Sequence, residues 1–256
     1  MEFKNDVAVI QQKATETNVG IIRRQAILNE LNLKQGQTVL DIGCGGGHLL
    51  KEISLAVGEK GNVIGIDTSD FQLKSAKEHC SNLPNIQLLC CSADVIELAD
   101  KSCDAVTSTQ TLEYIDDVDD VLREAKRLQK PNSKFVNIST LWDFFGFHGP
   151  DPELNKIMHD AVKGQKHSML PIQLSGKLKK LGYKNIKTQE INFFIKNKHD
   201  NSFPKCHEML MSNAARNKGV SEENILEWQK QLKTAEEEGY FAFTAYSILT
   251  SAYIPH

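Results

Sequence analysis

The stretch that most constrains this chain is TVLDIGCGGGHLL, which runs from Thr38 to Leu50. A short apolar run leads into Asp41, glycines then alternate at positions 43, 45 and 47, and an apolar pattern resumes after them. Because glycine reaches left-handed backbone conformations that other residues rarely adopt, this pattern predicts a tight turn between a buried strand and a helix. Such a turn presents bare backbone and the N–H groups of a helix N-terminus to a ligand.

Asp41 narrows the kind of ligand that this turn can take. The Walker loop requires GxxxxGK[ST], and no lysine stands at that place here. The dinucleotide fingerprint requires GxGxxG, but His48 occupies its last position. A carboxylate at the mouth of the turn repels a pyrophosphate and attracts a cation. The ligand that we expect is therefore S-adenosylmethionine, which carries both an ammonium and a sulfonium group.

Short apolar runs alternate with helical patterns about 10–15 residues long between positions 38 and 140. This alternation predicts right-handed βαβ units and a parallel sheet, and the nearly continuous apolar character of the runs fits strands that are covered on both faces. Before these runs, residues 5–33 have a helical pattern that is broken near Gly20. We expect strands at 38–43, 62–67, 85–94, 103–110, 134–140, in the second half of 171–196, and at 240–254.

The rhythm changes after position 140. Residues 141–152 read as an aromatic loop, and residues of about 205–238 read as a polar, helical insertion. The insertion could be a lid over an acceptor, a dimer surface or an ordinary helical hairpin. We interpret residues 1–256 as one domain, with an N-terminal helical cap (1–35), a cofactor-binding core (36–140) and an acceptor-side segment (141–256).

VLDIGCGGG resembles the glycine-rich motif of class I S-adenosylmethionine-dependent methyltransferases. Three further stretches resemble the motifs that follow it in this family, in the family's order: VIGIDTS, LCCSADVIEL and the segment 102–139. The whole pattern is most similar to the small-molecule branch, which includes quinone- and sterol-biosynthesis-type and arsenite methyltransferases. KPNSK replaces the familiar proline-glycine-glycine turn, outside the expected pocket.

The resemblance implies an α/β fold: a Rossmann-like, seven-stranded, mostly parallel sheet with an antiparallel last strand and helices on both faces. It implies that Asp67 binds the ribose hydroxyls, that Asp94 takes the adenine amino group, and that Gln110 and Thr111 lie near the methionine end. The implied cofactor-binding residues are Asp41, Gly43, Cys44, Gly45, Gly47, Asp67, Thr68, Ala93, Asp94, Val95, Gln110 and Thr111. The three aspartates also have local alternatives, as a turn cap or as ordinary strand-end acids.

The acceptor side is aromatic. Its candidate residues are Tyr114, Trp142, Phe145, His148 and His167. A lipophilic or aromatic acceptor, with His148 as a base or orienting group, is one interpretation. The other is that the aromatic residues cover a sheet edge and that the histidine is solvated. Arsenite is a poor acceptor candidate, because Cys206 is the only cysteine beyond the fourth strand.

Composition limits the remaining choices. The net charge of −3 and the lack of a basic stripe give no reason to expect nucleic-acid binding. The six cysteines form no zinc spacing, so we expect reduced thiols, no metal site and a cytoplasmic protein. The N-terminus lacks an apolar signal core, and no run is long enough to span a membrane. Monomer and homodimer both remain open.

The sequence therefore predicts a methyltransferase that acts on a small organic acceptor by in-line displacement. A non-catalytic S-adenosylmethionine-binding module is the first alternative. A nicotinamide-dependent oxidoreductase is weakened by Asp41, by His48 and by the lack of a Tyr-xxx-Lys pair. An aminopropyltransferase-like use of a related cofactor is the remotest alternative.

Overall fold

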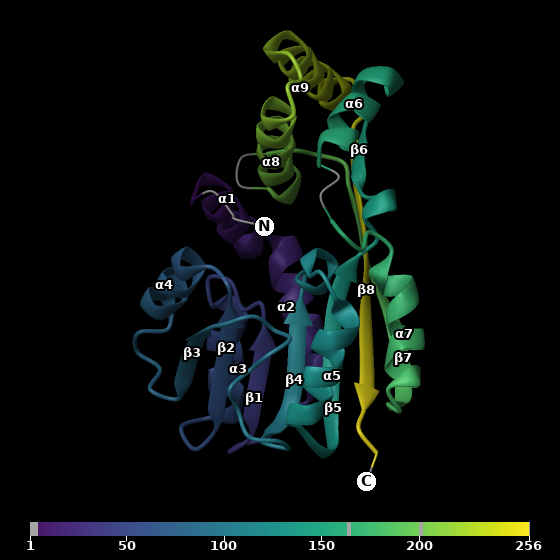
Figure 1. Ribbon diagram of the computed structural model, residues 1–256. Helices are drawn as coiled ribbons and strands as arrows, with labels where there is room; N and C mark the ends of the chain where they lie inside the picture. Colours follow the sequence, from purple (N-terminus) through teal and green to yellow (C-terminus); the bar gives the residue numbers. More distant parts are fainter. Residues whose placement is uncertain (1–4, 163–164, 200–201, 256) are drawn as a thin grey trace.

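The computed structural model describes residues 5–162, 165–199 and 202–255, so the first four residues of the expected N-terminal cap lie outside the described residues (Figure 1). The strands are β1 (Thr38–Ile42), β2 (Asn62–Asp67), β3 (Ile86–Cys90), β4 (Cys103–Thr109), β5 (Gln129–Thr140), β6 (Gly146–His148), β7 (Lys184–Ile195) and β8 (Ala242–Tyr253). The helices are α1 (Asn5–Glu16), α2 (Asn18–Leu31), α3 (His48–Val57), α4 (Asp70–His79), α5 (Val118–Leu128), α6 (Pro152–Val162), α7 (Leu170–Lys180), α8 (Phe203–Asn217) and α9 (Glu222–Glu237), with single 3₁₀ turns η1 (Leu112–Tyr114) and η2 (Trp142–Phe144).

The strands form one mixed sheet in the order β3-β2-β1-β4-β5-β8-β6, and β7 pairs with β8. Neighbours among β1 to β5 run parallel, whereas β8 runs antiparallel to β5, β6 and β7. The order reverses between β1 and β4, and open α/β sheets bind ligands beyond the carboxyl ends of their strands at such a point. The predicted α/β fold with an antiparallel last strand is confirmed.

The sheet has eight strands among the described residues, one more than we expected. The additional strand, β6, lies in the aromatic stretch that reads as a loop. β5 pairs with residues 247–253 of β8 and β6 pairs with residues 242–244, while β7 follows the whole strand along its other edge. After the chain leaves β5 and passes through η2, β6 therefore pairs with the remaining part of β8.

The N-terminal helices also break at a different place. Thr17, not the region of Gly20, separates α1 from α2: its extended backbone stops α1, and its hydroxyl accepts the Gly20 N–H at the start of α2. Side-chain capping of this kind supplies a partner that the first turn of a helix lacks. Gly20 lies inside α2, where a Cβ atom would come within 2.2 Å of the Thr15 carbonyl oxygen.

Helices cover both faces of the sheet because alternate strand residues point to opposite sides. In β1, Leu40 and Ile42 pack in the core with α5 and α7, whereas Val39 packs in the core with α2 and α3. A third core joins α1, β6, α6, α8, α9 and the first half of β8. Figure 1 shows α8, α9, α6 and β6 gathered at one end of the molecule, beyond the carboxyl ends of β1, β2 and β4.

Within the described ranges, no helix combines the length and the apolar character that a membrane crossing requires.

Candidate functional site

The glycine turn after β1 is fixed to its neighbours by backbone geometry. Gly43 has φ of 73°, a conformation that favours glycine. The N–H groups of Gly43 and Cys44 both donate to the Ile66 carbonyl oxygen at 2.9 Å, which ties the turn to β2. A Cβ atom on Gly43 would lie 2.2 Å from the Thr111 hydroxyl oxygen. A side chain at position 43 would therefore collide with the segment that follows β4.

Asp67 joins the ends of β1 and β2. The Gly45 N–H donates to its Oδ2 at 3.0 Å, and the Ser69 N–H donates to its Oδ1 at 2.9 Å. Burial raises the pKa of Asp67, and the N–H groups of Ser69, Gly45 and Thr68 partly offset this effect. The carboxylate is thus held in one orientation at the carboxyl edge of the sheet, and each oxygen keeps lone-pair capacity for a further donor.

Asp41 is only 2% exposed, and its Oδ1 has no hydrogen-bond partner among the described residues. Burial, and secondly the charge of Asp67, raises the pKa of Asp41 to about 7. A buried carboxyl group without a partner is destabilising unless something balances it. The arrangement fits a cationic ligand at the glycine turn, and disfavours a phosphate there.

Gln110 and Thr111 lie across the turn, where the sequence places them. Gln110 has φ of 53°, which is uncommon for a residue with a side chain and is often found at functional sites. Its N–H donates to the Ile138 carbonyl oxygen at 2.9 Å, and the Thr140 hydroxyl donates to its Oε1 at 2.8 Å. These bonds fix Gln110 between the carboxyl ends of β4 and β5.

Asp94 lies on the open side of the site, in the loop after β3. The loop and α5 enclose a hollow of about 430 Å³, lined by Asp94, Val95, Asp120, Arg123, Glu124 and Arg127. Asp94 and Thr68 are exposed, Ala93 is half-buried, and Val95 is 69% exposed. This side of the predicted cofactor site therefore faces solvent.

Arg127 fastens this loop to α5. Its Nη2 donates to the Ile96 carbonyl oxygen at 2.9 Å, and its Nη1 donates to the Leu98 carbonyl oxygen at 2.9 Å. Glu124, one turn earlier on α5, accepts the Ile96 N–H at 2.8 Å. The position of Asp94 therefore depends on two side chains of a neighbouring helix.

Four rings form a continuous aromatic cluster on the acceptor side. The Tyr114 and Trp142 ring centroids are 6.2 Å apart, those of Trp142 and Phe145 are 4.8 Å apart, and those of Phe145 and His207 are 4.9 Å apart. The rings come from η1, η2, the residue after η2, and α8. The structure thus brings three of the predicted acceptor residues together, and adds one that the sequence did not indicate.

His207 is the added residue. It is buried, and its Nδ1 lies 2.9 Å from the Phe203 carbonyl oxygen. Burial lowers the pKa of His207 to about 4, so the ring is neutral near pH 7. Nothing in the polar sequence of 205–238 distinguishes this histidine, because only the packing of α8 against Phe145 places it in the cluster.

The two predicted histidines lie elsewhere. His148 is exposed on β6, and its Nε2 is 2.9 Å from the Thr244 hydroxyl oxygen. Strand alternation buries Phe147 and turns His148 outward. His148 pairs with Ala242 of β8. Thr140, at the carboxyl end of β5, pairs with Ser247 of the same strand, five residues or about 16 Å further along. The structure gives no support for His148 as a base at the carboxyl ends of β4 and β5.

His167 contacts backbone instead of the aromatic rings. Its Nε2 lies 3.0 Å from the Ile115 carbonyl oxygen, and its own N–H donates to the Glu113 carbonyl oxygen at 3.1 Å. Both contacts satisfy carbonyl groups of η1 and of the residue after it. His167 is thus placed to hold the Tyr114 segment.

Two buried charged residues beside the cluster were missed by sequence reasoning. Glu113 is fully buried, its Oε1 accepts the Thr140 N–H at 2.9 Å, and burial raises its pKa to about 7. Arg23 is 6% exposed and donates from Nη2 to the hydroxyls of Ser247 at 2.8 Å and Thr140 at 3.2 Å. Residues 19, 23, 27 and 31 form the buried stripe of α2. That helical spacing was the available signal for Arg23.

A family model described as a methyltransferase domain matches residues 33–171, which is more than half of the chain. The chain belongs to the methyltransferase family. The predicted class I family and its cofactor, S-adenosylmethionine, are thereby confirmed, and the match spans all four motifs.

Relatives of this chain include an uncharacterised 37.1 kDa protein in transposon Tn4556 of Streptomyces fradiae, 30% identical over 66% of this chain and 51% of the relative. Demethylmenaquinone methyltransferase of Staphylococcus saprophyticus is 33% identical over 46% of this chain and 50% of the relative. The chain thus spans about half the length of the curated relatives it matches. A structure of phosphoethanolamine N-methyltransferase 2 from Haemonchus contortus has the same fold, with a TM-score of 0.66 at 17% identity, over 100% of this chain and 59% of that one.

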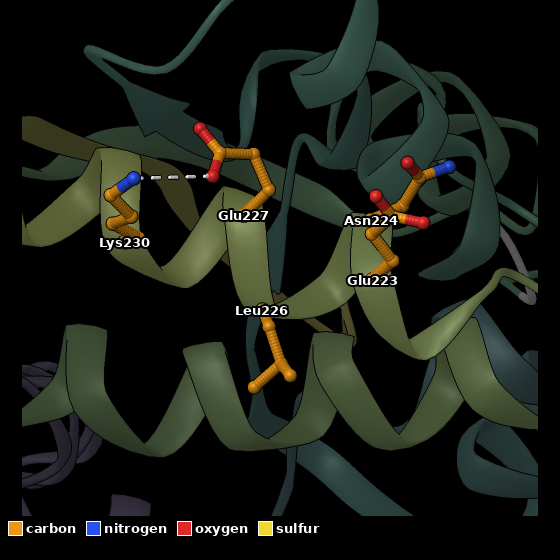
Figure 2. A pocket seen from close by; sticks show the side chains of 5 residues that line it. All are labelled: Glu223, Asn224, Leu226, Glu227 and Lys230. Carbon is orange, nitrogen blue, oxygen red and sulfur yellow. Dashed lines mark ion pairs between the residues drawn. The ribbon is translucent and has the colours of Figure 1, made fainter.

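The molecule also has a hollow of about 710 Å³ on the outer surface of α9 (Figure 2). Its five lining residues, Glu223, Asn224, Leu226, Glu227 and Lys230, all belong to one helix. Figure 2 shows that Glu227 and Leu226 point to different sides of α9, and that Glu227 pairs with Lys230, 3.7 Å away. Binding sites are concave and bring polar groups together from several elements. The polar groups of this hollow come from a single helix, and the cofactor residues lie on other elements.

Among the described residues, no cluster of His, Cys, Asp and Glu is arranged to hold a metal ion.

Proposed function

We propose that this protein transfers a methyl group from S-adenosylmethionine to a small, lipophilic or aromatic organic acceptor. The observation that carries the proposal is the joint placement of Asp41 and Asp67 at the glycine turn. Asp67 is anchored by Gly45 and Ser69 with lone pairs to spare, and the buried Asp41 Oδ1 has no hydrogen-bond partner among the described residues. A ligand with a ribose diol and a cationic end satisfies both carboxylates.

The role of each residue follows from its position. Asp67 accepts the two ribose hydroxyls, Asp94 accepts the adenine amino group, and Asp41 stabilises the cationic methionine end. Gly43, Gly45 and Gly47 let the ligand approach the backbone. Cys44 has a raised pKa because it is buried and lies near Asp41 and Asp67, so it remains a thiol and serves as a small packing residue.

The transfer itself asks the protein mainly for alignment. S-adenosylmethionine supplies an electrophilic methyl group, and an acceptor atom displaces the sulfur in line. Gln110 and Thr111 position the reacting end, and the rings of Tyr114, Trp142 and Phe145 form one wall of the acceptor site. Effective alignment of two reactants can contribute about 7–11 kcal/mol to catalysis. An apolar wall also excludes water, which strengthens the electrostatic contacts inside.

The aromatic cluster supports the lipophilic or aromatic acceptor. Stacked and edge-on ring pairs favour flat, apolar partners. The Staphylococcus saprophyticus relative is named for demethylmenaquinone. The phosphoethanolamine N-methyltransferase structure contains phosphomonomethylethanolamine, which is small and polar, so the shared fold serves more than one acceptor chemistry.

The test is methyl transfer with a labelled donor. The purified protein is incubated with S-[methyl-¹³C]adenosylmethionine and a panel of phenols, hydroquinones, naphthoquinols, amines and thiols, and mass spectrometry follows the label. We expect the label in a phenolic or quinol product together with S-adenosylhomocysteine. Binding of the donor with no labelled product across all five classes would contradict a catalytic function and favour the non-catalytic binding module.

A further inference from the structure

Arg23 carries a buried charge whose hydrogen-bond acceptors, among the described residues, are hydroxyl groups. Its Nη2 donates to Ser247 and Thr140, and its buried Nε has no hydrogen-bond partner among the described residues. Among the residues that the structure describes, no carboxylate lies within ion-pair distance of the Arg23 guanidinium. Removing a charge from water is strongly unfavourable unless it is paired or hydrogen-bonded. The buried Nε–H group of Arg23 therefore lacks a hydrogen-bond acceptor within the described part of the fold.

Aromatic rings hold the guanidinium in place. Its carbon lies 5.0 Å from the centroid of the Phe203 ring and 5.5 Å from that of Phe193. Rings at this distance stabilise a cation but offer no hydrogen-bond acceptor in the plane of the guanidinium. The rings and the two hydroxyls therefore orient Arg23 without using all of its donors.

The position of Arg23 fits contact with the acceptor better than contact with the cofactor. Its two hydroxyl partners lie on β5 and β8, and its ring partners lie on β7 and α8. Most cofactor residues lie instead at or after the carboxyl ends of β1, β2 and β3, and Gln110 and Thr111 follow β4. Thr140 links the two regions, because its hydroxyl contacts Arg23 at 3.2 Å and Gln110 at 2.8 Å. Arg23 thus lies one side chain beyond the residue assigned to the reacting end.

We propose that Arg23 is the anion-binding residue of the acceptor site, and that the acceptor carries a carboxylate or another anionic oxygen group beside its aromatic or apolar body. This inference rests on the proposed function and names the acceptor more narrowly. The Nε–H group of Arg23 remains as a donor for one anionic oxygen, because Nη2, which belongs to each two-donor edge of a guanidinium, already bonds Thr140 and Ser247. Desolvation lowers the pKa of Arg23 only to about 10, so the side chain keeps its charge at neutral pH.

Three titratable neighbours face this site. Burial raises the pKa of Tyr114, which therefore stays a neutral phenol. Glu113 acts on Arg23 through space, and its pKa of about 7 leaves it partly protonated near neutral pH. His207 is neutral there. The cluster consequently keeps a net positive character that a bound anion can balance, and Glu113 opposes that anion most strongly above pH 7.

Binding of matched probes to the protein saturated with S-adenosylhomocysteine tests the proposal. Ligand-observed NMR and calorimetry compare 4-hydroxybenzoate with 4-hydroxybenzamide, and 2-naphthoate with 2-naphthamide. We expect the wild-type protein to bind each carboxylate about tenfold more tightly than its amide, which is about 1.4 kcal/mol. Equal binding within each pair, or no binding of any probe, would overturn the proposal without the need for a variant.

Two variants assign the preference to a residue. Arg23→Met should abolish the carboxylate preference, and Arg24→Met should retain it. Arg24 is the matched control because it loses the same charge on the same helix but contacts Glu52 of α3 at 2.7 Å. Should Arg23→Met not fold, Arg23→Lys keeps the charge, loses the planar donor edge, and should reduce the preference.

Affinity for S-adenosylhomocysteine distinguishes failure of the acceptor assignment from failure of the proposed function. We expect this affinity to stay within about threefold of wild type in both arginine variants. A loss of more than about tenfold in Arg23→Met alone would mean that the bound anion is the cofactor's own carboxylate, which would overturn the acceptor assignment. Failure of the wild-type protein to bind S-adenosylhomocysteine would instead refute the proposed function.

Discussion

Asp67 is the residue on which the cofactor site most depends, because it connects the glycine turn to the start of α4. Asp67→Ala removes the acceptor of the ribose hydroxyls and leaves the Gly45 and Ser69 N–H groups without this partner. We expect affinity for S-adenosylmethionine to fall by roughly 2–4 kcal/mol, as for loss of hydrogen bonds to a charged group. Calorimetry measures the change. Asp143→Ala removes an exposed acid on η2 and should bind normally; an unchanged affinity in Asp67→Ala would refute the assigned role.

Asp41 should make cofactor binding depend on pH. Its pKa of about 7 in the free protein falls when a cation binds, because the cation favours the carboxylate. Affinity for S-adenosylmethionine should therefore rise from about pH 5.5 to pH 7, with a proton released on binding. Calorimetry in buffers of different ionisation enthalpy counts that proton.

Asp41→Asn provides the control for this pH dependence. The variant should release no proton, and it should bind S-adenosylmethionine more weakly at pH 7. In the free protein, the raised pKa means that the folded state holds the Asp41 proton more tightly than the unfolded state does. The protonated side chain therefore contributes to the free energy of unfolding, and this contribution is lost as pH rises through about 7. The asparagine variant should thus not show that loss in thermal unfolding. Equal proton release from wild type and variant would exclude Asp41 as its source.

At the scale of elements, Arg127 of α5 should control the loop that carries Asp94. Arg127→Ala removes the hydrogen bonds to the Ile96 and Leu98 carbonyl oxygens. Hydrogen exchange at residues 93–100 should accelerate, and affinity for S-adenosylmethionine should fall about three- to tenfold, because ordering the loop then opposes binding. Arg123→Ala, whose partner Asp120 is exposed on the same helix, should leave both unchanged. An unaltered exchange rate in Arg127→Ala would contradict this role.

The elements also show where sequence patterns suffice. The motifs between 38 and 140 predict β1 to β5 and α3 to α5, because alternating buried strands and capped helices leave strong local signals, such as the Ser69 cap of α4. β6 leaves no such signal. It is three residues long, and its existence depends on pairing with Ala242, about 95 residues further along the chain. Long-range pairing of this kind cannot be read from a local pattern.

For the whole molecule, Trp228 should be a principal contributor to stability. It is fully buried in the core between β6, α6 and α9, its Nε1 donates to Asn155 Oδ1 at 2.9 Å, and its ring meets Phe147 edge-on. Trp228→Ala should lower the free energy of unfolding by about 3–5 kcal/mol in urea. Leu226→Ala, on the same helix but 56% exposed, should change it by less than about 0.5 kcal/mol. Similar losses in both variants would contradict the packing described for α9.

In the candidate site, as in the fold, some features leave a local sequence signal and others do not. The placement of Asp41, Asp67 and the glycines at one turn could be predicted because it is set within one βαβ segment. Glu113 and His207 could not, because their contacts form only when η1 and α8 meet the strands β5 and β8. For Arg23, the helical spacing of α2 indicates burial but not its partners on β5 and β8. The location of His148 could not be predicted for a related reason: the excursion through η2 carries it onto β6, away from the carboxyl edge.

Calorimetric titration of the purified protein with S-adenosylmethionine, S-adenosylhomocysteine and NAD, in parallel at pH 7.5, tests the central claim most directly. Asp41 and Asp67 predict micromolar binding of both adenosyl ligands and no measurable binding of NAD, whose pyrophosphate the two carboxylates repel. Binding of NAD, or failure of both adenosyl ligands to bind, would contradict the assignment of the glycine turn as a methyl-donor site.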